Sequence, residues 1–580
     1  MNPPRFSRNV RLLLLSVLLG IVGALGAQLF IWMLGLGNHY LLTGVAGFVP
    51  PTPESVAGSA PLPVLPHLDW HIPLITTLGG LVAGMLVYAF APEAEGHGTD
   101  AVVRAYHRED GRMRARVPLV KSIASAITIG SGGSAGREGP TAQIAAGVAS
   151  ILGSAFRLSV EERRYLLLIG MAAGLSAIFK SPLGTAIFAA EILYGGLAFE
   201  ETVLGFTIIS AAVAYGITGA IEGWAPLFHL PANLTFEHPS ELIWYAVLGI
   251  AAGAVASLVP VIFYGTRDLF KKIPIPPHFK PAIGGLILGI PAMWLPQVLG
   301  GGYGWMQLAI DGRLPLLLML GLALAKIPAL ALTVGSGGSG GVFAPTLYVG
   351  TMLGGALALG LHGLAGPDVT SQAFAVVAMA AVFGAAARVP LATLVMVVEM
   401  TGGYYLVVPT MLAVVLAVMI QQAITRRWRY SSLYEAQVGS PAESPVHHGE
   451  YYRTTLALLR KHQFHLEDDI IVQEMADRLS QGQGVPLPGS PRRLYAIKVA
   501  GRSDAAWKKV RDIALPPDAN LVSVLRDRST IAVHGDTVVE AGDRVVAASP
   551  PAQLPELRRR FGDAAAGYSE ADEPVSAGTD

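Results

Sequence analysis

Residues 119–141 read LVKSIASAITIGSGGSAGREGPT, and residues 324–346 read LAKIPALALTVGSGGSGGVFAPT. Aligned without gaps at an offset of 205 residues, the two stretches agree at 13 of 23 positions. The agreement includes a lysine, Lys121 and Lys326, so it extends beyond the Gly/Ser run that could recur by chance. The alignment indicates that the chain contains two homologous halves.

A second pair of matching segments lies downstream at an offset of 208 residues. SPLGTAIFAAEI starts at Ser181, VPLATLVMVVEM starts at Val389, and Glu191 matches Glu399 within them. Because each glutamate has a counterpart in the other half, we expect both to brace equivalent helix contacts. Duplicated halves are typical of secondary transporters, whose binding site lies where the repeats meet.

Composition predicts a polytopic membrane protein, since the 580 residues are 52% hydrophobic and only 14% charged. Several apolar runs approach the roughly 20 residues that a membrane-spanning helix needs, and others are interrupted by Gly or Pro. The first run is too long for a signal peptide and lacks a small-residue cleavage site, so we expect a membrane segment there. The runs are Leu12–Leu36, Ile72–Phe90, Leu242–Phe263, Leu314–Val334 and Leu406–Ile420.

The distribution of Lys and Arg predicts the orientation of these segments. Basic residues flank the first and last runs and occupy the connections 104–116 and 267–272, whereas residues 37–71 and 223–241 contain neither Lys nor Arg. By the positive-inside rule, we expect a multi-pass protein of the cytoplasmic membrane with both termini in the cytoplasm. The chain has no cysteine, which excludes disulfides, and no basic stripe that would indicate a nucleic-acid partner.

Each Gly/Ser run leads into a segment that ends in proline, at Pro140 and at Pro345. Proline suits the first turn of a helix, and glycine lets backbone N–H groups approach a ligand. A helix N-terminus carries about half a positive charge, so two of them facing one cavity would form an anion site without a fixed full charge. A pair of tight helix-packing loops would leave the same pattern, and the spacing alone does not separate the two readings.

GREGP at 136–140, followed by GVFAP at 341–345, resembles the signature of the CLC family of chloride channels and transporters. The stretches VVEMT and SSLYEAQ resemble that family too, so the likeness covers nearly all of residues 10–436. The resemblance implies an all-α membrane domain, residues 1–430, built from two inverted repeats with roughly eighteen tilted helices. It also implies a homodimer in membrane lipid, with one pathway per subunit for chloride or another small anion and, in exchangers, for protons.

Carried over residue by residue, the resemblance makes Glu138 the gating glutamate, whose carboxylate competes with the anion for its path. A carboxylate beside helix N-termini can occupy the anion's position when ionised and leave it when protonated. Its counterpart in the other half is Phe343, and a charge present in only one half favours a functional role. The anion ligands that the resemblance implies are the backbone amides of Arg137, Glu138, Gly139, Val342 and Phe343, and the hydroxyl of Tyr434.

The sequence departs from the family pattern at two places. The GSGIP motif of the family stands here as GHGTD, which puts His97 where a serine hydroxyl normally donates to the central anion. We expect His97 either to bind the anion and relax the selectivity for chloride or to turn outward and pack. Exchangers of the family often carry an internal glutamate directly after the position of Glu191, where this chain has Ile192. We therefore expect passive or loosely coupled anion flux, and the sequence leaves channel and antiporter both open.

After Arg429 the composition changes to that of a soluble region. We expect a cytosolic linker over 431–490, with a helix around Tyr451–Leu459, and a small α+β domain over 491–562. Its expected strands are LYAIKV, LVSVL, TIAV and VVAAS, and its expected helices are DAAWKKVRDI and LPELRRRF. The acidic residues 563–580 are expected to be disordered.

The stretch ALPPDANLVSVLRDRSTIAVHGDTVVEAGDRVVAAS resembles the TrkA-C domain of cation-transport regulators. This implies a regulatory role, through dimerisation or the sensing of an unknown small ligand, and a passive assembly domain is the alternative.

The sequence as a whole predicts a chloride channel or anion/proton antiporter that needs no cofactor and is regulated by its C-terminal domain. The alternative is a cation transporter, which would need acidic or carbonyl-lined sites, whereas the repeats present helix N-termini. We do not expect an enzyme, because the sequence has neither an HExxH motif nor a cysteine nucleophile, and the GSGGS serines lack a nearby base.

Overall fold

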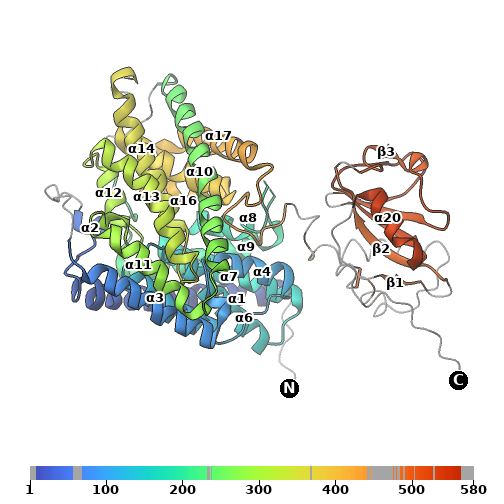
Figure 1. Cartoon of the computed structure of the whole chain (residues 1–580), viewed down its shortest axis with the longest axis horizontal. Coiled ribbons are helices and arrows are strands. Elements are labelled where there is room, and N and C mark those ends of the chain that lie inside the picture. Colours follow the sequence, from blue (N-terminus) through green and yellow to red (C-terminus); the bar gives the residue numbers. More distant parts are fainter. Residues whose placement is uncertain are drawn as a thin grey trace. The chain divides into compact units, whose positions relative to one another are not determined.

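The computed structural model divides the chain into two compact units, residues 1–437 and 438–580, which are described separately (Figure 1). The expected helix around Tyr451–Leu459 and the expected disorder of 563–580 lie outside the described residues. The described residues are 8–562, except for 57–67, 197, 232–235, 237, 366–368, 440–443, 445, 447–474, 476–477, 480–483, 488–489, 502 and 527–528.

The larger unit is all-α, and seven of its described helical segments are long and apolar enough to cross a membrane. Its described residues form seventeen α-helices of unequal length, in agreement with the roughly eighteen expected. They are α1 (Arg8–Gly37), α2 (Pro53–Val56), α3 (His71–Phe90), α4 (Thr99–Arg108), α5 (Val117–Gly130), α6 (Glu138–Ala155), α7 (Val160–Phe179), α8 (Pro182–Glu191), α9 (Glu201–Glu222), α10 (Glu241–Lys272), α11 (Lys280–Ala292), α12 (Tyr303–Ile310), α13 (Leu316–Val334), α14 (Phe343–Ala365), α15 (Ser371–Ala387), α16 (Pro390–Thr401) and α17 (Val407–Thr425).

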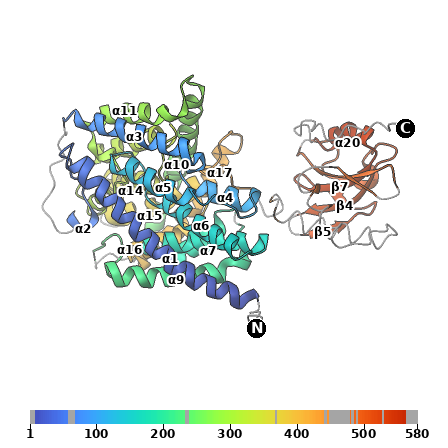
Figure 2. The same cartoon turned by 90° about the horizontal axis from the view of Figure 1, so that it is seen from below.

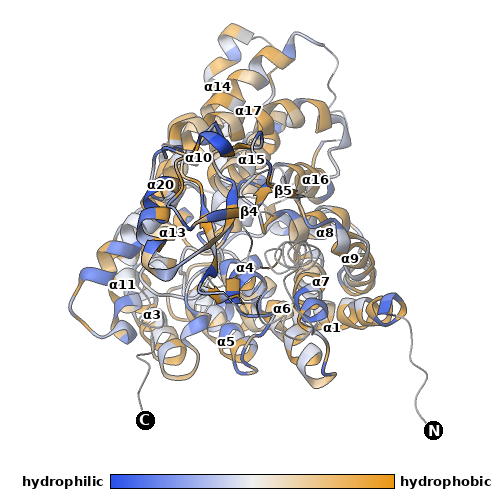
Figure 3. Ribbon diagram, turned by 90° about the vertical axis from the view of Figure 1, so that its right-hand side faces the viewer, coloured by the Kyte–Doolittle hydropathy of each residue, from blue (hydrophilic) through white to orange (hydrophobic). Residues whose placement is uncertain are grey.

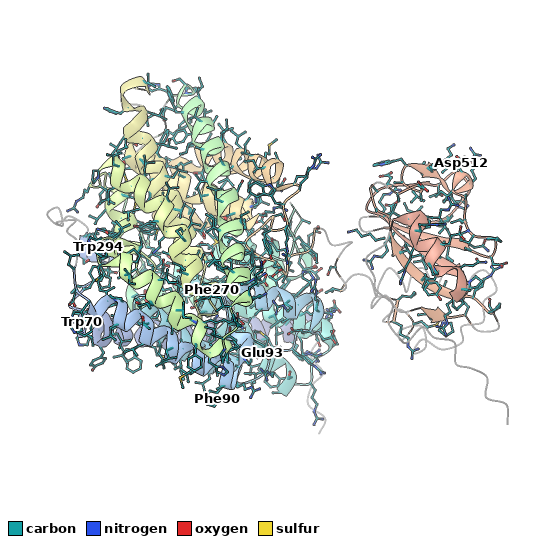
Figure 4. The ribbon with its side chains drawn as sticks, viewed as in Figure 1. Trp70, Phe90, Glu93, Phe270, Trp294 and Asp512 are labelled. Atoms are coloured by element: carbon teal, nitrogen blue, oxygen red, sulfur yellow. The ribbon has the colours of Figure 1, made fainter. Side chains whose placement is uncertain are left out.

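Helices that correspond in the repeat pack against each other. α3 lies beside α11 (Figure 2), and α8 lies beside α16. Trp70 at the start of α3 and Trp294 just beyond α11 lie at one end of their pair, and Phe90 lies at the other end (Figure 4), so the two helices run in opposite directions. Both tryptophans are mostly exposed, which is typical of aromatic residues at a membrane interface.

Gly136 and Gly341, which are equivalent in the repeat, lie on the local axis that relates the two halves. The N–H of Gly136 donates to the carbonyl of Gly341 at 2.8 Å, and the N–H of Gly341 donates to that of Gly136 at 2.7 Å. Two equivalent residues that exchange both hydrogen bonds in an antiparallel bridge are related by a two-fold rotation. The inverted repeat expected from the sequence is therefore confirmed.

Small residues allow the helices of this unit to approach closely. A Cβ atom on Gly170 of α7 would lie 2.7 Å from the carbonyl oxygen of Ala145 on α6, so only glycine fits at this crossing. Hydrophobic colours run along most of these helices in Figure 3. The sequence of α4, TDAVVRAYHR, is by contrast rich in polar residues. A segment as polar as α4 is suited to lining an aqueous cavity and not to facing lipid.

The smaller unit contains a five-stranded antiparallel sheet in the order β1-β2-β7-β4-β5, and a two-stranded sheet of β3 and β6. Buried side chains from the larger sheet and from α20 form its core. The predicted α+β domain, its main strands and the final helix LPELRRRF are confirmed. The elements are β1 (Val485–Pro486), β2 (Arg493–Lys498), β3 (Lys508–Lys509), β4 (Asn520–Arg526), β5 (Ser529–Ala532), β6 (Val538–Val539), β7 (Arg544–Ser549) and α20 (Leu554–Phe561).

The predicted helix DAAWKKVRDI is wrong. Turns precede the short strand β3, and a single 3-10 turn over Val510–Asp512 follows it. Trp507 has a φ of +66°, outside the helical region, and its N–H donates to the carbonyl of Val539 at 2.7 Å. Pairing with β6 therefore overrides the helix propensity of this Ala- and Lys-rich stretch.

Candidate functional site

The two Gly/Ser runs form matching loops that lead into α6 and α14. Gly132 and Gly337 adopt φ values of +99° and +106°, a conformation that L side chains rarely adopt, and this is why glycine stands at both positions. Because the loops meet at Gly136 and Gly341, the N-termini of α6 and α14 come together at the local axis. The predicted pair of helix N-termini at the repeat interface is present.

Glu138 lies at this meeting point and has no exposed surface. Its Oε2 accepts a hydrogen bond from the N–H of Ala344 in the first turn of α14, at 3.4 Å. Its Oε1 has no hydrogen-bond partner among the described residues. A carboxylate from one half of the protein therefore occupies the N-terminus of a helix from the other half, where the helix dipole favours negative charge.

Phe343, the counterpart of Glu138 in the other half, has different surroundings. Its ring packs against the rings of Phe179, Phe188 and Phe383, with centroid distances of 4.5, 5.8 and 3.8 Å. The equivalent positions thus hold a carboxylate beside polar backbone in one half and an aromatic cluster in the other.

His97 and Tyr434 are brought together although they are far apart in the sequence. Their rings lie 5.4 Å apart in an edge-to-face arrangement, and both side chains are buried. The Nδ1 atom of His97 is buried without a hydrogen-bond partner in the described part of the chain. The imidazole therefore has a ring nitrogen, Nδ1, that is available to hydrogen-bond a ligand.

A cavity of about 580 Å³ has His97 in its wall, and we call it the His97 cavity. Its other lining residues include Arg104 and Arg112 of one basic connection, and Arg267 and Lys271 of another. Both connections are those that the charge distribution predicts to be cytoplasmic. Nearby, the labelled Glu93 (Figure 4) pairs with Arg114 at the same cavity.

Asp100, which stands at the proline position of the GSGIP pattern, holds the segment that carries Tyr434. Its Oδ1 accepts a hydrogen bond from the N–H of Ala436 at 2.7 Å. Tyr264 of α10 donates its hydroxyl to the carbonyl of Leu433 at 2.7 Å. Residues 431–437, which the sequence assigns to the linker, therefore pack with the larger unit.

A second cavity, of about 260 Å³, has Arg137 in its wall, and we call it the Arg137 cavity. It is lined by Asn38 and Pro50–Pro53 from one segment without Lys or Arg, by Leu227 from the other, and by Gly300–Tyr303. The guanidinium of Arg137 lies over the ring of Tyr303, 4.9 Å from its centroid. Arg137 directly precedes Glu138 in the sequence, so this cavity is lined by the residue next to the buried carboxylate.

Sequence comparison of the halves missed a further repeat, a Gly-x-Gly turn at Gly96–Gly98 and at Gly300–Gly302. Gly98 and Gly302 have φ values of +84° and +82° and directly precede α4 and α12. The Nζ atom of Lys121 donates to the carbonyl of Gly96, and that of Lys326 to the carbonyl of Gly300, each at 2.7 Å. The sequence signal for this repeat is its spacing from the matched lysines, since Gly96 precedes Lys121 by 25 residues and Gly300 precedes Lys326 by 26.

A family model described as "Voltage gated chloride channel" matches residues 79–422, which is more than half of the chain. The chain belongs to the voltage-gated chloride channel family. A second model, described as "TrkA-C domain", matches residues 494–562. Both resemblances read from the sequence are therefore confirmed. The chain is an anion-transport protein of this family, and a cation transporter is not favoured.

Individual relatives agree with this assignment. The chain is 30% identical over 430 residues to a protein named "Voltage-gated ClC-type chloride channel ClcB" from Salmonella typhimurium, covering 73% of this chain and 98% of the relative. Its fold is similar to that of "a slow cyanobacterial Cl-/H+ antiporter", with a TM-score of 0.63, 22% identity, and coverage of 73% of this chain and 96% of the other. A "CLC-type fluoride/proton antiporter" matches with a TM-score of 0.61 and 22% identity over 75% of this chain and all of the other.

Within this family fold, the two matched glutamates join the halves. Glu191 accepts hydrogen bonds from the N–H groups of Leu391 and Ala392 at 3.1 and 2.7 Å, at the start of α16. Glu399 accepts from the N–H groups of Leu183 and Gly184 at 3.2 and 2.9 Å, at the start of α8. Each glutamate therefore caps the helix that carries the other, as expected for a structural pair. Ile192, directly after Glu191, is fully buried.

Proposed function

We propose that the chain moves chloride or another small anion across the cytoplasmic membrane, between the His97 cavity and the Arg137 cavity, with Glu138 as the gate. The observation that carries this proposal is the buried carboxylate of Glu138 on the N–H of Ala344. It is a negative group at a helix N-terminus in the position where an anion would be stabilised. A transported anion and this carboxylate therefore compete for the same donors.

The two states of the carboxylate would act as the two states of the gate. When ionised, Glu138 is held by the N-terminus of α14 and blocks the anion from it. When protonated, it loses this charge-dipole attraction and leaves the donors free. The unused Oε1 is the oxygen that can take a proton without breaking the bond to Ala344.

His97 and Tyr434 would receive the anion on the side of the His97 cavity. A neutral imidazole presents one N–H and the tyrosine one O–H, and both can donate to an anion. The backbone amides of Arg137, Gly139, Val342 and Phe343 are the further ligands that family membership suggests. Because the histidine replaces a hydroxyl, we expect weaker discrimination between chloride and nitrate than a serine would give.

The proposed mode of transport rests on Ile192. Its side chain carries no proton and is fully buried at the position where exchangers of the family often have an acid. We therefore propose passive or loosely coupled anion flux through a channel-like pathway, in a homodimer with both termini in the cytoplasm. The TrkA-C domain would regulate this pathway from the cytoplasm by dimerising or by binding a small ligand.

The test is the reversal potential of the purified protein in liposomes under separate chloride and pH gradients. We expect a potential that follows the chloride gradient and responds weakly, without a fixed stoichiometry, to the pH gradient. A shift with pH at a fixed whole-number ratio would contradict loose coupling. A potential that follows a cation gradient would contradict the proposed function itself.

A further inference from the structure

We propose that the Arg137 cavity contains a second anion-binding site, distinct from the helix N-termini at Glu138, in which the side chains of Arg137 and Tyr303 bind a small inorganic anion. The inference rests on the proposed function only for the identity of the anion. The site itself follows from four features of the cavity.

The first feature is an unused charge. In the described part of the chain the guanidinium of Arg137 forms no ion pair and has no hydrogen-bond acceptor, and its Nε atom is buried. The acidic groups whose charges reach it are Glu138, Glu54 and Glu222, and none is within ion-pair distance. Buried charges are normally paired, so a largely buried arginine without an anion points to a ligand that completes it.

The second feature is an unused hydroxyl at the same place. Tyr303 lines the cavity, its ring lies under the guanidinium at 4.9 Å, and its hydroxyl is buried without a described partner. A ring that stacks on a guanidinium holds it in one orientation and leaves the N–H edge free for hydrogen bonding. Arg137 and Tyr303 therefore present donors that neighbouring groups do not use.

The third feature is a second buried cation behind the wall. Lys326 donates to the carbonyls of Val298 and Gly300 at 2.8 and 2.7 Å, and Gly300 lines the cavity. The lysine thereby neutralises carbonyl oxygens that would otherwise repel an anion. The lining loop Gly300–Gly302 has no side chains, so its backbone is open to the cavity.

The fourth feature is the repeat. Gly300–Gly302 is the counterpart of Gly96–Gly98, and Lys326 is the counterpart of Lys121. The His97 cavity and the Arg137 cavity are thus built on the same turn and the same buried lysine. Where the first turn carries an imidazole, the second carries Gly301, and Arg137 supplies the polar side chain instead.

The volume of about 260 Å³ admits a monovalent anion the size of chloride, bromide or nitrate together with water. The lining segments without Lys or Arg place this cavity on the external face, so the site would bind anions that arrive from outside. Its role is to raise the local anion concentration next to Glu138. This predicts an effect on apparent affinity from one side of the membrane only.

The experiment compares initial chloride uptake in right-side-out and inside-out membrane vesicles. For Arg137→Gln we expect the KM for external chloride to rise roughly tenfold, with a much smaller change in maximal rate, because a charge-assisted interaction is lost. Tyr303→Phe keeps the ring and removes the hydroxyl, so its KM should rise about threefold. From the inside, both variants should have wild-type KM values.

Arg427→Gln is the matched control, since it removes an exposed arginine that lines neither cavity and should leave the external KM unchanged. An unchanged external KM in both Arg137→Gln and Tyr303→Phe would overturn the proposal, and so would an equal change from both sides. Arg137→Lys tests folding separately, because it keeps the charge and should recover part of the affinity.

A binding measurement separates this site from the transport function. Crystals grown in bromide should show an anomalous peak beside Arg137 and Tyr303 in the wild type and none there in Arg137→Gln. A wild-type crystal without that peak would overturn the site even if anion flux is normal. A clear peak in a protein without flux would support the site and contradict the proposed function.

Discussion

The two halves of the membrane unit have the same backbone plan and differ in a few side chains. Lys121 and Lys326 each bind two carbonyl groups, and Glu191 and Glu399 each cap the helix of the other half. Each half of the fold contains the same buried backbone carbonyl and N–H groups, and these matched residues form hydrogen bonds with them. Matched residues of this kind stabilise the fold in the same way on both sides of the local axis.

The differences gather where an anion would pass. Between the two halves, Glu138 corresponds to Phe343, Arg137 to Val342, and His97 to Gly301. Phe343 packs in an aromatic cluster, whereas the carboxylate of Glu138 accepts a hydrogen bond at the N-terminus of α14. If an anion passes here, the two ends of its pathway lie in the two halves of the repeat. Residues that differ between the halves would then give the two ends different chemical groups.

The matched lysines should give the largest effects on stability. Lys121→Met and Lys326→Met each leave two buried carbonyl groups without a donor, and we expect each to lower the free energy of unfolding by about 3 kcal/mol. Thermal unfolding in detergent, followed by circular dichroism, measures this. Arg427→Met, at an exposed arginine, is the control and should leave Tm unchanged. A wild-type Tm in either lysine variant would break the structural equivalence of the pair.

The matched glutamates should give the next largest effect. Glu191→Ala and Glu399→Ala each expose two helix N-terminal amides to an apolar interior, at a cost of about 2 kcal/mol. Glu191→Gln and Glu399→Gln keep an acceptor oxygen and should be less damaging. Unfolding of the four proteins under one condition measures this. If Glu191→Ala were harmless and Glu399→Ala severe, the two residues would not be equivalent.

The unmatched His97 should affect selectivity, with a smaller change in free energy. His97→Ser restores a hydroxyl at the entrance to the pathway, and we expect the chloride-over-nitrate preference to change by about threefold. Ion-substitution measurements in liposomes determine the preference. His362→Ser changes an exposed histidine on α14 and serves as the control. An unchanged preference in His97→Ser would mean that the imidazole only packs against Tyr434 and Phe263.

Much of this arrangement could be predicted from the sequence. The repeat predicted the paired loops, and the symmetry of Glu191 and Glu399 predicted their structural role, because a duplicated residue satisfies a duplicated contact. The asymmetry of Glu138 and Phe343 likewise drew attention to the position now found at the N-terminus of α14. These inferences succeeded because they compared one part of the chain with another.

The remaining features depend on tertiary contacts that one segment does not encode. A Gly-x-Gly turn is too short to stand out among 67 glycines, so Gly300–Gly302 was recognised only through the contact with Lys326. The unused donors of Arg137 and Tyr303 became visible only once the chain was folded. In the smaller unit, the pairing of β3 with β6 overrode local helix propensity around Trp507.

Titration of the proposed gate, Glu138, can be separated from that of one acid in the wall of the His97 cavity. Glu435 lines the His97 cavity, and its hydrogen bond to Arg267 holds the pKa of this carboxyl below its usual range. A depressed pKa means that the carboxylate stays ionised, with its ion pair intact, until the pH falls below the ordinary range for glutamate. Glu435 therefore contributes no change of charge between about pH 5 and 8.

The most direct test of Glu138 as the gate is anion flux against pH for wild type, Glu138→Gln and Phe343→Leu in liposomes. We expect Glu138→Gln to abolish the pH dependence, because an amide cannot ionise and return to the N-terminus of α14, and we expect Phe343→Leu to keep the wild-type profile. A wild-type pH profile in Glu138→Gln, or an equal loss of pH dependence in both variants, would contradict the assignment of Glu138 as the gate.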